Sequence, residues 1–371
     1  MKCCIIGAGS GGRAFAAYLS SKGHIVNIYN RSYHRIADIR KYGGIEAEGK
    51  LKGFFSVNMA TQSMEKAVKG SKMIFVVTPA SAHKYVARQL APFLENGQLI
   101  ILNPGRTFGS SEFLNIIQQR KGICPIAVCE AQTLLFTSRA LESNRVKIHK
   151  IKKNVKIATF PEKHIDRYDE ILRDIFPQFE SCDDYLELTL YNVGMFLHPT
   201  ISLLNAGPLD NGMNLKFYSE GASNRVCQVL EKLEFEINQV YKQLGLKQFR
   251  FTRWAQQCYG VDNIHERIYE CLQNLSIYQK IDAPKTLMTR YFTEDVPTGL
   301  VPFSSLAKFF GISVPTIDSN IHLSSILCGI DFYKEGRTLS KLGLIGYITE
   351  QFRVRQGIWS DLFSKKSIET L

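Results

Sequence analysis

The first residues of the chain carry a glycine pattern of the kind that binds phosphates. Gly7, Gly9 and Gly12 have the spacing G-x-G-x-x-G and directly follow the apolar run Lys2–Ile6. Gly7 permits a tight turn, Gly9 lets the backbone approach a pyrophosphate, and Gly12 allows a helix to pack closely on the strand. The N–H groups at the start of that helix would face the phosphates. The pattern predicts a dinucleotide site made of Gly7, Gly9, Ser10, Gly11 and Gly12.

The residues after the second apolar run, Ile25–Tyr29, indicate which dinucleotide is bound. An Asp or Glu at this place would accept hydrogen bonds from the ribose hydroxyls of NAD, but the chain has Asn30, Arg31 and Ser32. Arg31 can pair with a 2′-phosphate, and Asn30 and Ser32 can donate to it. NADP(H) is therefore favoured over NAD(H). The alternative is an NAD enzyme in which Arg31 is a solvated loop residue.

Further polar residues follow later strands or lie in the second half of the chain. Thr78 and Pro79 follow a third apolar run, and Asn103 follows a fourth, where loops would line the nicotinamide end of a cofactor. His198 lies six residues after Asn192, which is not one helical face, so the pair needs either a break near Pro199 or two different roles.

A charged segment near residue 290 completes a possible reaction site. It offers the guanidinium of Arg290 and the carboxylate of Asp295. A carboxylate that orients His198 and an Arg that holds a substrate carboxylate are what reduction of a keto acid or its imine requires.

The elements that must position these residues alternate between strand and helix in the first half. Predicted strands are Lys2–Ile6, Ile25–Tyr29, Met73–Val77 and Leu99–Leu102, and predicted helices are Gly11–Ser21, Tyr33–Lys41, Ala82–Leu94 and Ser111–Arg120. This alternation predicts an α/β Rossmann domain with a doubly wound, mostly parallel sheet. From about Leu186 long helical periodicities follow, notably Asn224–Leu244 and Ile317–Tyr333. We therefore expect a dinucleotide-binding domain at 1–185 and an all-helical substrate domain at 186–371.

The net charge of +12 raises polyanions as partners, but the excess is local. Residues 1–185 hold 27 Lys and Arg against 16 Asp and Glu, whereas residues 186–371 hold 19 against 18. Part of the excess lies in Val146–Thr159, which alternates apolar and basic residues and is expected to form a hairpin turning near Lys152. Its basic side chains are expected to be a solvated face, without nucleic-acid binding, because no aromatic residues alternate with them. They are Lys147, Lys150, Lys152, Lys153 and Lys156, and Arg145 directly before the segment belongs to the same basic run.

Other features exclude several classes of protein. No apolar run is long enough to cross a bilayer, which favours a cytoplasmic protein without a membrane partner. The nine Cys include no CxxC and have no His at metal-ligand spacing, so reduced thiols and no metal site are expected. Trp254 and Trp359 are expected to be core or interface anchors. The amphipathic segment Asn224–Leu244 could bury a core face or a homodimer face.

Together these segments resemble the octopine/nopaline (opine) dehydrogenase family. The resemblance covers nearly the whole chain and includes the segments around Pro79, Asn103, Glu130, His198, Phe217, Arg290 and Arg337. It implies an NAD(P)H-dependent reductive condensation of an amino acid amine with a 2-keto acid. It further implies His198 as general acid/base, Asp295 as its orienting carboxylate, Arg290 as the grip on a substrate carboxylate, and Glu130 in the cofactor region. The chain departs from NAD-using members at Asn30–Ser32, where it lacks the acidic residue.

Two other functions remain open from the sequence. One is a reductase of a 2-keto acid or ketone, of the ketopantoate reductase or glycerol-3-phosphate dehydrogenase type, for which a Lys acid/base in the second domain would be expected. The other is a non-catalytic NADP(H)-binding sensor, in which replacing His198 would leave activity untouched.

Overall fold

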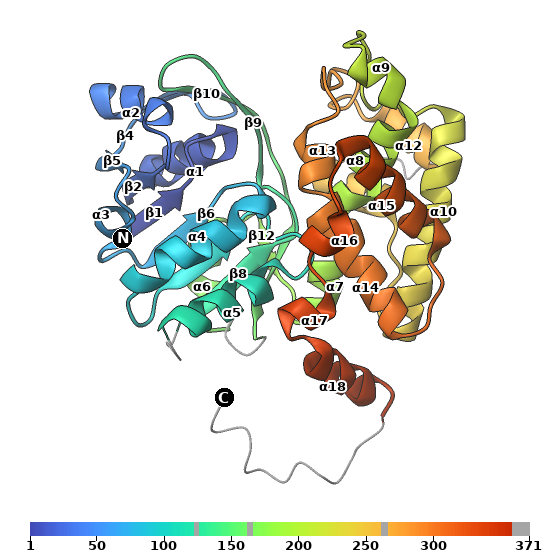
Figure 1. Cartoon of the computed structure of the whole chain (residues 1–371). Helices are drawn as coiled ribbons and strands as arrows, with labels where there is room; N and C mark the ends of the chain where they lie inside the picture. Colours follow the sequence, from blue (N-terminus) through green and yellow to red (C-terminus); the bar gives the residue numbers. More distant parts are fainter. Residues whose placement is uncertain (122–125, 162–165, 261–265, 358–371) are drawn as a thin grey trace.

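A computed structural model describes residues 1–121, 126–161, 166–260 and 266–357. Two bodies lie side by side, a sheet domain built from the first half of the chain and a helical domain built from the second (Figure 1). The α/β-plus-helical fold expected from the sequence is confirmed. The last strand ends at Ser181, close to the predicted domain boundary.

The main sheet has eight strands in the order β12-β11-β8-β7-β6-β1-β2-β5. All neighbouring strands pair in parallel except β8 and β11, which are antiparallel. The central strands are almost completely buried, which explains why they read as continuous apolar runs rather than as alternating ones. The strands are β1 (Lys2–Ile6), β2 (Ile25–Tyr29), β5 (Met59–Thr61), β6 (Met73–Val76), β7 (Leu99–Leu102), β8 (Ala127–Ala131), β11 (Val155–Phe160) and β12 (Phe179–Ser181).

Helices cover both faces of this sheet, as a doubly wound fold requires. On one face the aromatic side chain of Phe15 in α1 packs with Phe75 and Phe176. On the other face Val86 of α4 and Phe113 of α5 share a core with Ile74. The helices and 3-10 turns are α1 (Ser10–Ser21), η1 (Tyr33–Arg35), α2 (Ala37–Tyr42), α3 (Met64–Val68), η2 (Ala80–Ala82), α4 (His83–Leu90), η3 (Ala91–Phe93), α5 (Gly109–Lys121) and α6 (Asp166–Ile175).

A second sheet of four strands, not expected from the sequence, corrects the predicted hairpin. Its order is β4-β3-β10-β9, formed by β3 (Gly44–Gly49), β4 (Gly53–Ser56), β9 (Phe136–Ala140) and β10 (Arg145–Ile151). The two strands expected to pair, β10 and β11, therefore belong to different sheets, because β10 pairs with β9 and β3 whereas β11 pairs with β8. The hairpin prediction is wrong, and Lys152 lies in the connection between β10 of the second sheet and β11 of the main sheet.

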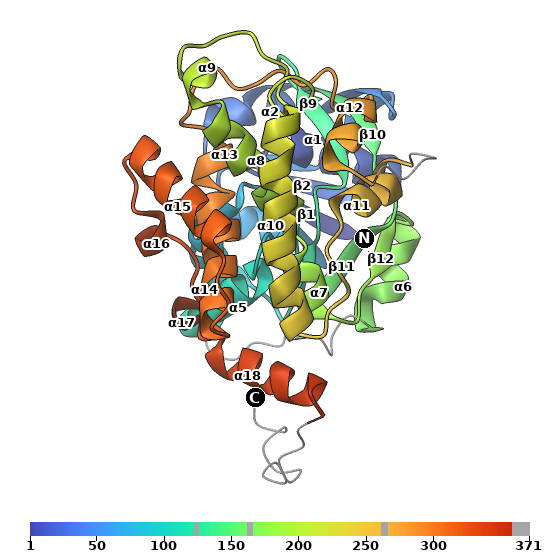
Figure 2. The same ribbon diagram turned by 90° about the vertical axis from the view of Figure 1, so that its right-hand side faces the viewer.

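The second half is helical from α7 onward within the described residues, apart from one isolated bridge between Lys216 and Asp282. The long helix α10 runs along much of the height of this domain, with α9 above its upper end and α18 below its lower end (Figure 2). The segment Ile317–Tyr333, expected as one helix, is interrupted at Gly329, whose φ of 62° ends α15. The helices are α7 (Tyr185–Leu190), α8 (Val193–Leu204), α9 (Ala206–Asp210), α10 (Asn224–Gln243), α11 (Phe251–Tyr259), α12 (Ile268–Asn274), α13 (Arg290–Thr293), the π-helical turn η5 (Val296–Leu300), α14 (Val301–Phe309), α15 (Pro315–Cys328), α16 (Phe332–Glu335), α17 (Leu339–Leu342) and α18 (Ile345–Arg355).

One buried arginine ties the two domains together. Arg337, 1% exposed, reaches from the segment after α16 into the sheet domain, where its Nε and Nη2 each lie 2.9 Å from Glu112. Its Nη1 donates to the carbonyl oxygen of Thr107 at 2.9 Å. These bonds fix the helical domain against the loop that follows β7.

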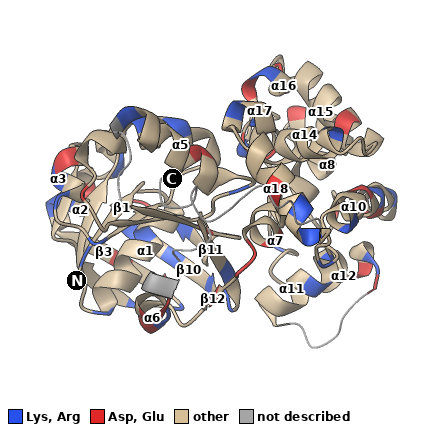
Figure 3. Ribbon diagram, turned by 90° about the horizontal axis from the view of Figure 1, so that it is seen from below, with Lys and Arg blue, Asp and Glu red and all other residues tan. Residues whose placement is uncertain are grey.

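The described residues bear on the expectations about charge, thiols, metal sites and membrane spans. Lys and Arg are spread over elements of both domains rather than gathered in one patch (Figure 3). The described Cys have free thiols, no group of His, Cys, Asp and Glu in the described ranges could hold a metal, and no described helix is long and apolar enough to span a membrane. Cys124 and Trp359 lie outside the described residues.

Candidate active site

A cavity of about 470 Å³ lies where the carboxyl ends of the parallel strands meet the helical domain. Its walls combine the glycine loop, the loops after β6, β7 and β8, and side chains of α8, α11 and α13. The charged residues that line it are Arg106, Lys152, His198, Arg290 and Glu294. Ligands of doubly wound folds bind at this edge of the sheet.

The glycine loop has the geometry that the sequence predicted. Gly7 has a φ of 113°, and a Cβ there would lie 2.5 Å from the carbonyl oxygen of Val77. A Cβ on Gly12 would lie 1.8 Å from the oxygen of Gly7, so the first turn of α1 packs directly on the loop. An added Cβ on Gly9 meets nothing within 4 Å, and Gly9, Ser10 and Gly11 all line the cavity. This open approach to the backbone fits a bound pyrophosphate.

Two buried polar atoms lack a partner among the described residues on the part of the cavity wall that the loops after β6 and β7 form. They are Thr78 Oγ1 and Asn103 Nδ2. Asn103 Oδ1 accepts from the backbone N–H of Leu135 at 3.1 Å, which fixes the amide and leaves its N–H groups for a ligand. Since unpaired buried polar groups are costly, these atoms fit the amide and ribose oxygens of a nicotinamide cofactor. Pro79 also lines the cavity.

Glu130 is not among the residues that line the cavity. It is 1% exposed, its Oε2 accepts from the backbone N–H of Ser110 at 2.7 Å, and it fills the space beside Gly105. Burial raises the pKa of its carboxyl. Glu130 therefore supports the loop after β7 through its contacts with Gly105 and Ser110.

The three residues after β2 divide their roles. Asn30 Oδ1 accepts from the N–H of Ala8 at 3.1 Å, so Asn30 holds the glycine loop, and its Nδ2 donates to the carbonyl of Ser32 at 3.1 Å. Arg31 is exposed, and its guanidinium lies 5.5 Å from the ring centroid of Tyr85. Arg31 thus presents a free positive charge beside an aromatic face.

On the other side of the cavity His198 forms a dyad with Asp295. His198 Nδ1 lies 2.7 Å from Asp295 Oδ2, and its Nε2 lies 3.0 Å from the hydroxyl of Tyr218. The imidazole stacks on the ring of Tyr291 with centroids 4.2 Å apart. The sequence analysis predicted the pairing of His198 and Asp295, which are 97 residues apart, but not the two tyrosines.

Burial and charge set the protonation of this dyad. Burial lowers the pKa of His198, and the Asp295 carboxylate offsets part of that effect. Burial raises the pKa of Asp295, but Arg106 and His198 outweigh it and lower the pKa below its ordinary value. An ionised Asp295 accepts from Nδ1–H, which leaves Nε2 as the nitrogen that exchanges a proton in the cavity.

The sequence analysis missed Arg106, which links the dyad to the sheet domain. It lies 3.1 Å from Glu294 through Nε and 3.3 Å from Asp295 Oδ1 through Nη2. Its Nη1 donates to Asn192 Oδ1 at 3.2 Å. A charged residue directly after Asn103-Pro104-Gly105, at the carboxyl end of β7, is the signal that could have revealed it.

Of the two alternatives that the spacing of Asn192 and His198 left open, the structure favours different roles, because there is no break near Pro199. Helix α8 continues from Val193 to Leu204 with Pro199 inside it. Asn192 is the N-cap of this helix, accepts from the N–H of Met195 at 3.3 Å, and is 3% exposed. It is not among the residues that line the cavity, so it positions Arg106 and α8.

Arg290 and Lys152 line the cavity and have no acidic partner within 4 Å among the described residues. Arg290 is exposed, with its guanidinium 5.9 Å from the ring centroid of Tyr291. The expectation that Lys152 belongs to a solvated face is wrong, because only 7% of Lys152 is exposed. Trp254 is buried, as expected of a core residue, but it also lines the cavity.

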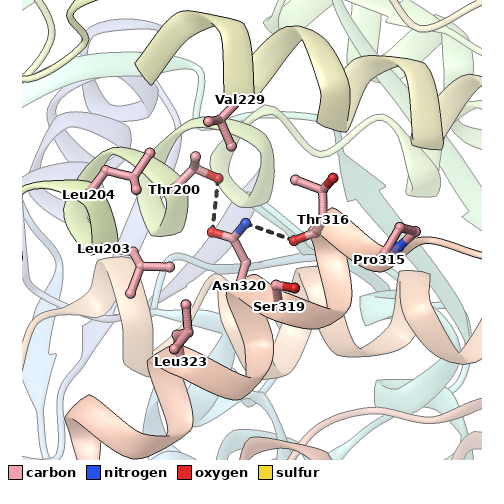
Figure 4. A pocket seen from close by; sticks show the side chains of 9 residues that line it. All are labelled: Thr200, Leu203, Leu204, Val229, Pro315, Thr316, Ser319, Asn320 and Leu323. Carbon is pink, nitrogen blue, oxygen red and sulfur yellow. Dashed lines mark hydrogen bonds between the residues drawn. The ribbon is translucent and has the colours of Figure 1, made fainter. Parts of the chain in front are cut away.

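A second hollow lies between α8, α10 and α15 (Figure 4). It measures about 310 Å³ and no charged side chain lines it. Its polar centre, Asn320, is already bonded to the hydroxyl of Thr200 and the carbonyl of Thr316. The reacting groups therefore lie in the larger cavity.

Comparisons with known proteins agree with this fold and site. Residues 181–328 match the family model for the alpha-helical domain of NAD/NADP octopine/nopaline dehydrogenase, and residues 2–156 match the N-terminus of NAD-dependent glycerol-3-phosphate dehydrogenase. An opine dehydrogenase from Arthrobacter sp. (strain 1C) is 37% identical over 343 residues, which cover 92% of this chain and 95% of the relative.

Solved structures show the same architecture. Octopine dehydrogenase with NADH and L-arginine superposes with a TM-score of 0.77 at 18% identity, covering 98% of this chain and 100% of the other. Yersinopine dehydrogenase with NADP⁺ gives 0.70 at 14% identity, covering 95% and 99%. Fold, site and relatives define an NAD(P)-dependent oxidoreductase. The chain belongs to the opine dehydrogenase family.

Proposed function

We propose that the chain condenses the amine of an amino acid with the carbonyl of a 2-keto acid and reduces the resulting imine with NADPH. The observation that carries this proposal is the His198–Asp295 dyad beside Arg290, a cation without an acidic partner among the described residues, in a cavity that the glycine loop also lines. The relatives include an octopine dehydrogenase solved with L-arginine and one solved with pyruvate, an amino acid and a 2-keto acid.

In this proposal residues 1–185 bind the cofactor and residues 186–371 supply the reacting side chains. The pyrophosphate would lie on Gly9, Ser10 and Gly11, and the nicotinamide end near Thr78 and Asn103. When bound, the nicotinamide supplies the hydride that reduces the imine carbon.

His198 would handle the protons of the reaction. Imine formation expels the carbonyl oxygen as water, and this step requires a proton donor at that oxygen. Protonated His198 donates through Nε2, while Asp295 holds Nδ1–H and stabilises the imidazolium. Arg290 pairs with the carboxylate of the keto acid and fixes its carbonyl beside Nε2. Tyr218, bonded to Nε2, keeps the ring in this orientation.

Arg31 favours NADPH as the cofactor. Its guanidinium is exposed beside Tyr85 at the place where a 2′-phosphate would lie, and the sequence there has no carboxylate to accept from ribose hydroxyls. One solved relative has NADP⁺ bound and another NADH, so the choice in this chain rests on Asn30–Ser32.

Cofactor oxidation with a matrix of substrates tests the reaction. NADPH oxidation is followed with each of several 2-keto acids, alone and with each of several amino acids. We expect fast oxidation only when both substrates are present. Oxidation with a keto acid that is indifferent to every amine would replace the condensation with a simple ketone reduction.

A histidine variant separates catalysis from binding. His198→Ala should lower turnover by about 10²- to 10⁴-fold with little change in cofactor affinity, because general acid–base catalysis contributes about that much. His322→Ala is the matched control, since His322 is an exposed residue of α15. Equal losses of turnover and cofactor affinity in His198→Ala would make His198 a structural residue.

A further inference from the structure

Lys152 is a buried cation in the cavity that the proposed chemistry has not yet used. It lies between β10 and β11, where its backbone N–H donates to the carbonyl of Leu135 at 3.0 Å. Only 7% of the residue is exposed, yet it lines the cavity. Its Nζ donates to Thr133 Oγ1 at 2.8 Å and lies 5.8 Å from the ring centroid of Trp254.

The ammonium of Lys152 has no counter-ion in the described part of the chain. No described carboxylate lies within 4 Å of its Nζ, whereas Arg106, another cation of the cavity wall, pairs with both Glu294 and Asp295. Burial, with smaller contributions from the nearby guanidinium groups of Arg106 and Arg290, lowers the pKa of Lys152 to about 8. Burial of an unpaired charge is costly, so a ligand anion would relieve the cost.

Two neutral donors stand beside this cation. Thr133 Oγ1 accepts from Lys152 and therefore keeps its own proton to donate. Trp254 is 4% exposed, lines the cavity, and its Nε1–H is buried without a partner among the described residues. An ammonium, a hydroxyl and an indole N–H offer only donors, which is the complement of a carboxylate.

The charges of the cavity match the two substrates of a condensation. An amino acid and a 2-keto acid each bring one carboxylate, and the cavity wall has two cations without a described acidic partner, Arg290 and Lys152. Arg290 adjoins Tyr291, which stacks on His198, so it serves the substrate whose carbonyl His198 protonates. Lys152 remains for the other carboxylate.

The wall around Lys152 also indicates the side chain of that substrate. Lys152 lies 5.9 Å from the ring centroid of Tyr259, and the cavity is further lined by Tyr278, Ile277 and Ile281. No described acidic side chain other than Glu294, which pairs with Arg106, lines the cavity. This surface fits an apolar or aromatic amino acid side chain better than a cationic one.

We propose that Lys152, Thr133 and Trp254 bind the carboxylate of the amine-donating amino acid and that this amino acid has an apolar side chain. The proposal rests on the proposed condensation for the identity of the ligand. It makes Lys152 a specificity-determining residue that contacts substrate, with His198 and Arg290 acting on the keto acid.

Binding measurements test this subsite without requiring turnover. The dissociation constants of L-leucine and L-leucinamide are measured by calorimetry with the NADPH-loaded enzyme and with its Lys152→Met variant. The wild type should prefer L-leucine, and Lys152→Met should weaken L-leucine by about 10- to 100-fold, the usual loss for a charge-assisted hydrogen bond. The affinity for L-leucinamide should change less than 2-fold, because it lacks the carboxylate.

Controls separate this role from a structural one. Lys153→Met removes the adjacent lysine, which is exposed, and should change neither constant. The melting temperature of Lys152→Met should not fall, because an unpaired buried charge is removed. Thr133→Val should weaken the binding of L-leucine, as Lys152→Met does, and should leave the binding of L-leucinamide unchanged.

Several outcomes would overturn the subsite. Equal affinity of the wild type for L-leucine and L-leucinamide would do so, as would equal losses of both in Lys152→Met. A loss that falls on pyruvate or on NADPH would assign Lys152 to that ligand instead. Failure of the condensation itself gives a different result: no amino acid would stimulate NADPH oxidation with any keto acid, in the wild type or in Lys152→Met.

Discussion

The Asp295→Asn variant tests the dyad through the pH dependence of the reaction. The substitution keeps the shape of the side chain and an acceptor for His198 Nδ1, 2.7 Å away, but it removes the negative charge. Asp295 is fully buried, so solvent does little to screen this charge. A neighbouring opposite charge shifts a pKa by about 1–3 units, and its loss lowers the pKa of His198 further.

Arg106 reduces the size of the expected shift in the pKa of His198, because it lies 3.3 Å from the other oxygen of Asp295 and already neutralises part of the carboxylate charge. We therefore expect a fall of about 1–2 units in the pKa of His198. In the reductive direction the protonated imidazole is the active form, so activity falls as pH rises through this pKa. The activity of the variant should therefore begin to fall at a lower pH than that of the wild type. At pH 7 the rate of the variant should be about 10- to 100-fold lower than the wild-type rate.

The assay is kcat/KM for NADPH oxidation between pH 5 and pH 9, with both substrates present. Glu294→Gln is the control, since Glu294 pairs with Arg106 but does not contact His198. In this control the pH at which activity falls should shift less than in Asp295→Asn. If the pH at which kcat/KM falls is unchanged or higher in Asp295→Asn, the role of Asp295 is refuted.

Three further predictions concern stability and cofactor choice. Burial lowers the pKa of Lys152 from 10.5 to about 8, so below pH 8 the charged lysine destabilises the folded state by about 3 kcal/mol. Urea unfolding should therefore show that Lys152→Met is more stable than the wild type at pH 7, and this gain in stability should shrink as pH rises toward 10.5. A variant less stable than the wild type at pH 7 would contradict this prediction. Arg337→Met leaves Glu112 buried without its closest partner, which should lower the free energy of unfolding by about 3–5 kcal/mol and reduce the melting temperature. An unchanged melting temperature would show that the contact between the domains does not depend on this ion pair. Arg31→Ala should weaken NADPH about 10-fold and NADH by less than 2-fold, and equal losses in a binding titration would remove the case for NADPH.

The main sheet and the glycine loop could be predicted from the sequence because both depend on local signals. Buried parallel strands such as Leu99–Leu102 are continuous apolar runs, and the spacing of Gly7, Gly9 and Gly12 is itself the signal of the turn. The second sheet could not be predicted in the same way. Its strand β4 (Gly53–Ser56) is short and largely exposed, without an apolar run.

The error at the predicted hairpin has a physical reason. Asn154 has a φ of 51°, and residues 152–154 do form a turn-like crossing, so the local pattern was compatible with a hairpin. What separates β10 from β11 is pairing with strands far away in the chain, β3 and β8. Such long-range pairing leaves no mark in the alternation of the segment itself.

The reacting side chains show the same limit. His198 and Asp295 were identified through a family resemblance, and the structure places them in contact. Arg106 and Lys152 come from loops of the other domain and become site residues only when the two domains meet. A lysine in a basic run is usually solvated, and nothing in residues 145–156 distinguishes Lys152, buried, from Lys153, exposed.

The fate of two isotopic labels in one reaction tests the central claim most directly. The enzyme is supplied with ¹⁵N-labelled amino acid, unlabelled 2-keto acid and NADPH that carries deuterium at its transferable position, and the products are examined by mass spectrometry. The condensation predicts one secondary amine dicarboxylate that contains both the ¹⁵N and the deuterium. Deuterium found in a 2-hydroxy acid, with the ¹⁵N-labelled amino acid left unreacted, would contradict it.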